Sequence, residues 1–230
     1  MKYSLFLLSA LFFQIALLAQ NKTFVEMKAG SKIMDVLTPA DVLFNPQFTD
    51  GKVFFRDGTV VAAKLNYNCL FDEIHFIDPK GDTLALANEK TISYISIDKD
   101  TFYYEQGYLR LLAANHVARL AEKQVWRVGG NKVNSAFNTA STTSAITSYT
   151  SYNTAGSRYS LAINEDVDLR KVRNYYFGDN NNRFVPAGKK NLLMLFPKAQ
   201  RQIERYLEEN KVDFTKREDL EKVIQFLEHL

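Results

Sequence analysis

Turn signals at short intervals between residues 51 and 113 constrain the fold of this chain more than any other feature. Asp57-Gly58 separates two runs of β-forming residues, and this pair is a strong hairpin signal because Gly accepts a positive φ. Pro79 fixes φ in a second turn, over residues 78–81. The strands expected between such turns cover residues 52–56, 59–67, 70–77, 83–87, 91–97, 101–104 and 108–113. Strands this short and this closely spaced predict an antiparallel meander that curls into a sandwich or small barrel.

The C-terminal region carries helical signals instead. Pro197 is suited to the first position of a helix that ends near Asn210. Thr215 and Glu218 have the spacing of a capping box, which predicts the start of a second helix. The apolar residues of this second helix recur at helical spacing, at Leu220, Val223, Ile224 and Leu227. The fold class expected is therefore β-rich α+β, with a C-terminal pair of short helices joined near residues 211–214.

Residues 117–128 fit either a helix or a strand. A helix would align Val117, Leu120 and Val128, among others, on one face. A strand would instead place Arg119, Lys123 and Arg127 on one face and Leu120, Trp126 and Val128 on the other. The strand is favoured because residues 125–128 are β-rich and end at a Gly-Gly pair. A later hairpin is expected from strands at 168–177 and 183–185, with a polar turn between them.

Half of the residues in the segment 135–160 are Ser or Thr, and Arg158 is its only charged residue. Such a composition buries too little apolar surface to build a core, so a flexible loop is expected. The predicted organisation is then a signal peptide over 1–19, a β-meander domain over 20–134, this loop, and a hairpin with the helix pair, packed on the same core, over 161–230.

The N-terminus has the pattern of a signal peptide. Lys2 supplies the positive charge, an apolar run from Leu5 to Leu18 follows, and Ala19 is a suitable cleavage residue. The run is short for a membrane span, which needs about 20 apolar residues, although an uncleaved anchor stays open as the alternative. Export to the periplasm is favoured over release outside the cell, because the chain ends in helices and not in a β-rich sorting domain. No transmembrane span is expected in the mature chain.

Cysteine and charge exclude several classes of protein. Cys69 is the only cysteine, so the chain is not expected to be a lipoprotein and cannot form an internal disulfide. The net charge of +3 gives no strongly basic face, so no nucleic-acid partner is expected.

One further set of residues spans most of the chain after residue 20, apart from the Ser/Thr segment: 48–58, 65–68, 76–78, 81–88, 164–167, 195–198, Ile203, 206–210 and 219–220. Through these residues the sequence resembles a family of uncharacterised exported proteins of the Bacteroidota. The resemblance implies export without implying an activity.

Metal binding has one weak candidate pair in the sequence. Glu73 and His75 point the same way on a strand, which suits two metal ligands. A third ligand would have to come from elsewhere, and the other histidines are His116 and His229. An exposed strand face with ordinary charges explains the pair better, so neither a metal nor a cofactor is expected. Cys69 lies beside an apolar strand and is expected to be a buried structural thiol.

Catalysis has no assembled signature. Carboxylates for sugar hydrolysis would have to come from acids such as Asp72, Glu73, Glu165 and Asp166, whose spacing singles none of them out. The tyrosine pairs 103–104 and 175–176 place one ring on each sheet face, and an outer ring offers a stacking surface for a sugar. The expected function is a non-catalytic exported envelope protein, acting as a binding or structural module for another envelope protein or a glycan. The alternative is a periplasmic hydrolase that uses paired carboxylates.

Overall fold

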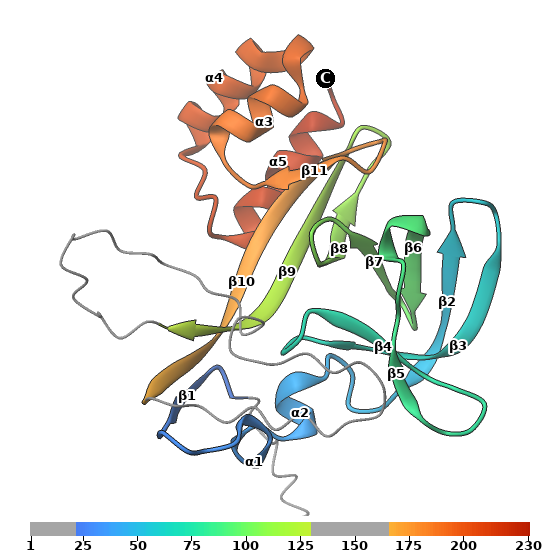
Figure 1. Cartoon of the computed structure of the whole chain (residues 1–230). Helices are drawn as coiled ribbons and strands as arrows, with labels where there is room; N and C mark the ends of the chain where they lie inside the picture. Colours follow the sequence, from blue (N-terminus) through green and yellow to red (C-terminus); the bar gives the residue numbers. More distant parts are fainter. Residues whose placement is uncertain (1–21, 130–165) are drawn as a thin grey trace, which may run out of the picture.

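The computed structural model describes residues 22–129 and 166–230, which form one antiparallel sheet accompanied by short helices (Figure 1). The predicted signal peptide over 1–19 and the Ser/Thr segment over 135–160 lie outside the described residues. Within the described ranges, no helix combines the length and the apolar character needed to cross a bilayer.

The strands are β1 (Phe24–Met27), β2 (Thr49–Phe55), β3 (Val60–Asn68), β4 (Glu73–Ile77), β5 (Thr83–Ala85), β6 (Ile92–Ile97), β7 (Asp100–Tyr104), β8 (Tyr108–Ala114), β9 (Ala118–Gly129), β10 (Val167–Asp179) and β11 (Phe184–Pro186). The α-helices are α1 (Ile33–Val36), α2 (Pro39–Val42), α3 (Lys189–Leu195), α4 (Gln200–Asn210) and α5 (Arg217–Leu227), and short 3-10 turns lie at Glu89–Thr91 and Pro197–Ala199.

The strand order is β1-β10-β9-β8-β7-β6-β2-β3-β4-β5, with β11 paired to β10. Most neighbours in the sheet are neighbours in sequence, so the predicted antiparallel meander is confirmed. The sheet is strongly curled, because the Trp126 N–H of β9 donates to the Cys69 carbonyl just after β3 (2.9 Å), although four strands separate β3 from β9. The described strands nevertheless stay in one open sheet, whose edges β1 and β5 do not pair. Of the two forms expected for the meander, a sandwich or a small barrel, closure into a barrel is therefore not observed.

The β2–β3 hairpin forms at Asp57-Gly58 as predicted, and Gly58 has φ +90°. The ambiguous segment 117–128 is a strand, since it falls within β9. The expected start of a strand at residue 70 is wrong, because β4 begins only at Glu73. The Asn68 side chain accepts the N–H groups of Leu70 and Phe71, which turns the chain before β4 and leaves Asp72 at φ +58°.

The C-terminal helix pair is confirmed as α4 and α5, but its boundaries differ from the prediction. Pro197 opens a 3-10 turn, and the α-helix begins at Gln200. The Thr215 hydroxyl donates to Asp213 and does not cap a helix, so the predicted capping box is absent and α5 begins at Arg217. The sequence did not predict four of the elements or the contacts that they make: α3, β1, α1 and α2.

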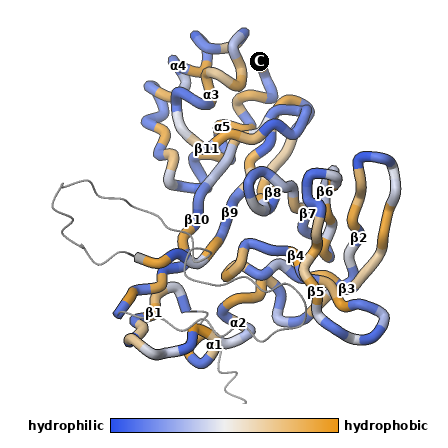
Figure 2. Tube along the Cα trace, viewed as in Figure 1, coloured by the Kyte–Doolittle hydropathy of each residue, from blue (hydrophilic) through white to orange (hydrophobic). Residues whose placement is uncertain are grey.

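Two hydrophobic clusters occupy different parts of the same face of β9. Trp126 belongs to the cluster inside the curl, whereas Leu120 belongs to the cluster under α3, α4 and α5. Residues 120, 122, 124 and 126 share this face because side chains alternate along a strand. Figure 2 shows hydrophilic residues along the middle of β9 and β10, between hydrophobic stretches nearer their ends. A polar boundary therefore separates the two clusters.

Candidate functional site

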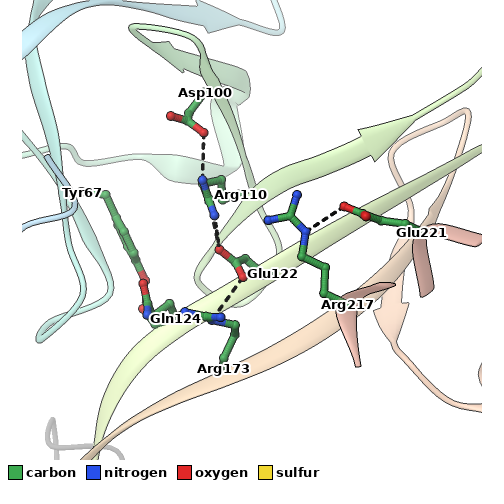
Figure 3. Close-up of polar contacts among 8 residues, drawn as sticks. All are labelled: Tyr67, Asp100, Arg110, Glu122, Gln124, Arg173, Arg217 and Glu221. Atoms are coloured by element: carbon green, nitrogen blue, oxygen red, sulfur yellow. Dashed lines mark hydrogen bonds and ion pairs between the residues drawn. The ribbon is translucent and has the colours of Figure 1, made fainter. Parts of the chain in front are cut away.

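The boundary between the two clusters is lined by a row of alternating charges, which we call the polar seam: Asp100, Arg110, Glu122 and Arg173 (Figure 3). They come from β7, β8, β9 and β10, which are consecutive neighbours in the sheet. Arg110 lies directly opposite Glu122 in the β8–β9 register, so the sheet pairing itself brings these two charges together.

Glu122 is the centre of the polar seam. Its Oε1 accepts from Arg110 Nε at 3.0 Å, and its Oε2 lies 3.4 Å from Arg173 Nε. Arg110 Nη1 also donates to Asp100 Oδ1 at 3.1 Å. The Glu122 side chain is only 4% exposed, so its charge would be costly without the two arginines.

Arg110 and Arg173 differ in their access to solvent. The Arg110 side chain is 24% exposed and its guanidinium lies 4.8 Å from the centre of the Phe44 ring, which covers it. The Arg173 side chain is 53% exposed, so its guanidinium reaches solvent while it remains beside Glu122.

Helix α5 adds a third guanidinium to the rim. Arg217 Nε donates to Glu221 Oε1 at 2.7 Å, and its side chain is 42% exposed. The hydrogen bond to Glu221 raises the pKa of Arg217, and the negative charge of Glu122 adds to this effect. The rim of the polar seam therefore carries two half-exposed guanidiniums, one from the sheet and one from a helix.

A small pocket opens beside the polar seam. Its volume of ≈ 10 Å³ is close to what a single water molecule needs. Its walls are Phe44, Tyr67, Phe102, Arg110, Glu122 and Gln124. The pocket thus joins aromatic surface to the buried part of the polar seam, at a scale below that of a sugar ring.

Asp72 organises a second polar cluster next to this pocket. Its Oδ1 accepts from the Tyr108 N–H at 2.9 Å and lies 2.9 Å from the Tyr67 hydroxyl, while its Oδ2 is 3.4 Å from Lys123 Nζ. Burial raises the pKa of Asp72, and Lys123 opposes that effect. Gly107 has φ +118° and passes so close that a Cβ would meet both Asp72 and Lys123 within 3 Å. This cluster fixes the β7–β8 turn against the turn before β4 and thereby holds the curl of the sheet.

Glu73 and His75, the weak candidate pair for a metal, do lie together. His75 Nε2 is 3.1 Å from Glu73 Oε2, and both side chains are largely buried. No third ligand joins them, because in residues 22–129 and 166–230 no group of three His, Cys, Asp or Glu side chains is placed to hold a metal ion. His116 instead lies on the surface, 3.9 Å from Glu228, and His229 is exposed near the C-terminus.

The acids considered for hydrolysis are dispersed. Asp72 contacts Lys123 and Glu73 contacts His75, as described above. Asp166 lies on the surface, where it accepts from Lys28 Nζ at 2.8 Å and from the Ala29 N–H at 2.9 Å. Glu165 lies outside the described residues. These acids do not converge on one site in the part of the chain that the structure describes.

Cys69 is a buried thiol, as predicted, and burial raises its pKa to about 11.

The tyrosine rings considered for sugar stacking are all half-buried. The Tyr103 ring packs against Phe184 at 5.1 Å, and the Tyr104 ring packs against Tyr108 at 5.2 Å. Tyr175 and Tyr176 likewise pack against hydrophobic clusters, so the rings of both pairs contribute to packing.

Sequence reasoning missed the polar seam, although one signal for it was present. Glu122 interrupts the face of β9 that carries Leu120 and Trp126, and a charged residue at a core position needs a buried partner. The partners could not be named, because Arg110 and Arg173 come from strands whose register the sequence does not specify.

The arrangement can bind an anionic group but is poorly suited to transfer a proton. Arg173 and Arg217 offer exposed donors with fixed positive charge, whereas Glu122 and Asp100 are already occupied as acceptors. Comparison of the chain with protein-family models, with curated proteins and with solved structures found no match.

Proposed function

We propose that this protein is a non-catalytic exported protein of the cell envelope, which acts as a binding or structural module. Its partner is another envelope protein or a glycan, bound through an acidic group at the polar seam. The observation that carries the proposal is the pair of half-exposed guanidiniums, Arg173 and Arg217, on either side of a buried and already neutralised Glu122. Planar guanidiniums bind carboxylates, sulfates and phosphates through paired hydrogen bonds.

Export rests on the N-terminal pattern and on the resemblance to exported proteins of the Bacteroidota. The predicted mature protein begins at Gln20 and resides in the periplasm. N-terminal sequencing of the protein released by osmotic shock tests both points, with Gln20 as the expected first residue. Recovery of the protein mainly from the medium of intact cells would count against the periplasm.

Capture from cross-linked cell envelopes tests binding. A tagged wild-type protein is compared with the double variant Arg173→Ala/Arg217→Ala. The matched control is Arg201→Ala/Arg205→Ala, which removes two exposed arginines of α4 at a distance in sequence from the polar seam. Loss of a captured partner in the first variant only is the expected result, and equal capture by all three proteins contradicts binding at the polar seam.

A periplasmic hydrolase with paired carboxylates is the second candidate. Asp100 and Glu122 are the two carboxylates of the polar seam, and Glu122 also lines the pocket, although both acids are held as acceptors by Arg110. Retaining and inverting hydrolases need two carboxylates about 5–10 Å apart, with different protonation roles. Hydrolysis of envelope glycans by the wild type that disappears in both Asp100→Asn and Glu122→Gln would favour this candidate over the binding module.

A further inference from the structure

One polar side chain in the wall of the pocket beside the polar seam has no partner. Arg110 and Glu122 bind each other, and the Tyr67 hydroxyl lies 3.0 Å from the Gln124 carbonyl oxygen. Gln124 also lines the pocket, and within the described part of the chain its side-chain amide makes no hydrogen bond. Because an amide both donates and accepts, this group suits a ligand hydroxyl.

Gln124 lies next to an exposed cation of the polar seam. In the β9–β10 register it is directly opposite Arg173, so the two side chains leave the same face of the sheet (Figure 3). Side chains of such opposite residues start about 4.5–5.5 Å apart, which is within reach of a single ligand. A ligand that contacts the Arg173 guanidinium therefore also meets the Gln124 amide and the pocket that Gln124 lines.

The two half-exposed arginines of the rim keep donors free for a ligand. The Arg217 side chain donates to Glu221 through Nε, and the closest contact of Arg173 with Glu122 is also through Nε. The terminal Nη groups of both guanidiniums make no hydrogen bond within the described chain. Such groups bind the paired oxygens of a carboxylate or a sulfate.

The size of the pocket favours one of the two kinds of partner, a protein or a glycan. Its volume of ≈ 10 Å³ admits one group of about the size of a water molecule. Protein partners usually anchor through Trp, Tyr or Arg side chains that fill pockets, and none of these fits here. A sugar hydroxyl does fit, and the C–H groups beside it can pack against the aromatic wall of the pocket.

We propose that the ligand of the polar seam is an acidic saccharide, that is, a sugar that carries a carboxylate or a sulfate. Its acidic group binds the Nη groups of Arg173 and Arg217, while a neighbouring hydroxyl enters the pocket and bonds to the Gln124 amide. Gln124 is then the residue that selects a saccharide over an acidic peptide. This inference rests on the anion binding proposed above for the polar seam.

Isothermal titration of the purified protein with a short chain of galacturonic acid tests the proposal. Two further probes are compared: the fully methyl-esterified chain, which has the same sugars without charge, and a glutamate peptide, which has the charge without sugars. The wild type is expected to bind the galacturonate chain about tenfold or more tightly than either, because only this probe supplies both the anion and the hydroxyl. Gln124→Leu removes the amide at similar size, so it should weaken galacturonate binding about tenfold and leave binding of the peptide unchanged.

Gln202→Leu is the matched control, because it makes the same chemical change at an exposed position of α4, and it should bind like the wild type. Equal affinity of the wild type for galacturonate and peptide, with both lost in Arg173→Ala/Arg217→Ala, overturns the saccharide but leaves the anion site. Binding of neither probe overturns both. Equal effects of Gln124→Leu and Gln202→Leu overturn the role of Gln124. If circular dichroism shows that Gln124→Leu folds poorly, the comparison of the three probes on the wild type decides.

Discussion

Replacement of Glu122 by Gln removes the charge at the centre of the polar seam while keeping the shape of the side chain. Arg110 then retains only Asp100 as a charged partner, at 3.1 Å, and Arg173 loses its partner at 3.4 Å. Breaking a buried ion pair by removing one partner costs about 3–5 kcal/mol in a fully desolvated site. The cost at the polar seam should be lower than this range, because water can replace part of the lost interaction. Arg110 is 24% exposed and Arg173 is 53% exposed.

The expected loss of unfolding free energy is therefore about 2–3 kcal/mol. For a urea dependence of about 2–3 kcal/mol per molar, the unfolding midpoint should fall by about 1 M. Urea titrations followed by Trp126 fluorescence measure this shift, since Trp126 is buried in the cluster beside the polar seam.

Glu221→Gln is the matched control for this prediction. It makes the same chemical change in a half-exposed pair with Arg217 on one helix, and such pairs contribute about 0.3–0.5 kcal/mol. Equal urea midpoints for the Glu122 and Glu221 variants would refute the reasoning, because Glu122 would then contribute no more than a surface charge.

Three further predictions concern single residues. Leu220→Ala should cost about 2–5 kcal/mol of unfolding free energy, because Leu220 is a fully buried residue of α5. Replacement of exposed Lys222 by Ala should change it by less than about 0.5 kcal/mol, and urea midpoints compare the two variants. Burial raises the pKa of Asp72 above its usual 3.8, so its protonated form contributes stability that is present at low pH and is lost as pH rises through the folded-state pKa. The urea midpoint of the wild type, measured relative to that of Asp72→Asn, should therefore fall between pH 4 and pH 7. A difference between the two midpoints that stays constant over this range would contradict the prediction. Cys69 should resist a thiol reagent in the folded protein and react fully in urea, because its pKa is about 11 and its side chain is buried; rapid reaction without urea would show otherwise.

Local signals predicted the local elements well. Asp57-Gly58 fixes a hairpin whatever surrounds it, and the apolar spacing from Leu220 to Leu227 suffices for an amphipathic helix. Helix α3 was missed because its seven residues include two adjacent lysines and too few turns to show a period. Thr215 matched a capping box but bonds to Asp213, since a hydroxyl and a nearby carboxylate compete locally with the helix end.

The polar seam depends on contacts that the sequence does not specify. Arg110 and Glu122 are brought together by the β8–β9 register, which includes an irregularity between Leu111 and Ala113. Arg173 reaches Glu122 because β10 pairs with β9 as well as with β11, although a long stretch of sequence separates β10 from β9. Glu122 on an apolar strand face predicts that a partner exists, but long-range pairing decides which residue it is.

Site-specific photo-cross-linking in living cells tests the central claim that the polar seam binds an envelope partner. A photoreactive amino acid replaces Lys171 in one strain, a half-buried residue of β10 two positions from Arg173 and on the same face of the sheet, and exposed Asn180 in the turn after β10 in another. A discrete adduct that forms from position 171 and not from position 180, and that is lost when Arg173→Ala/Arg217→Ala is added, is the expected result. No adduct from position 171, or the same adducts from both positions, would contradict binding at the polar seam.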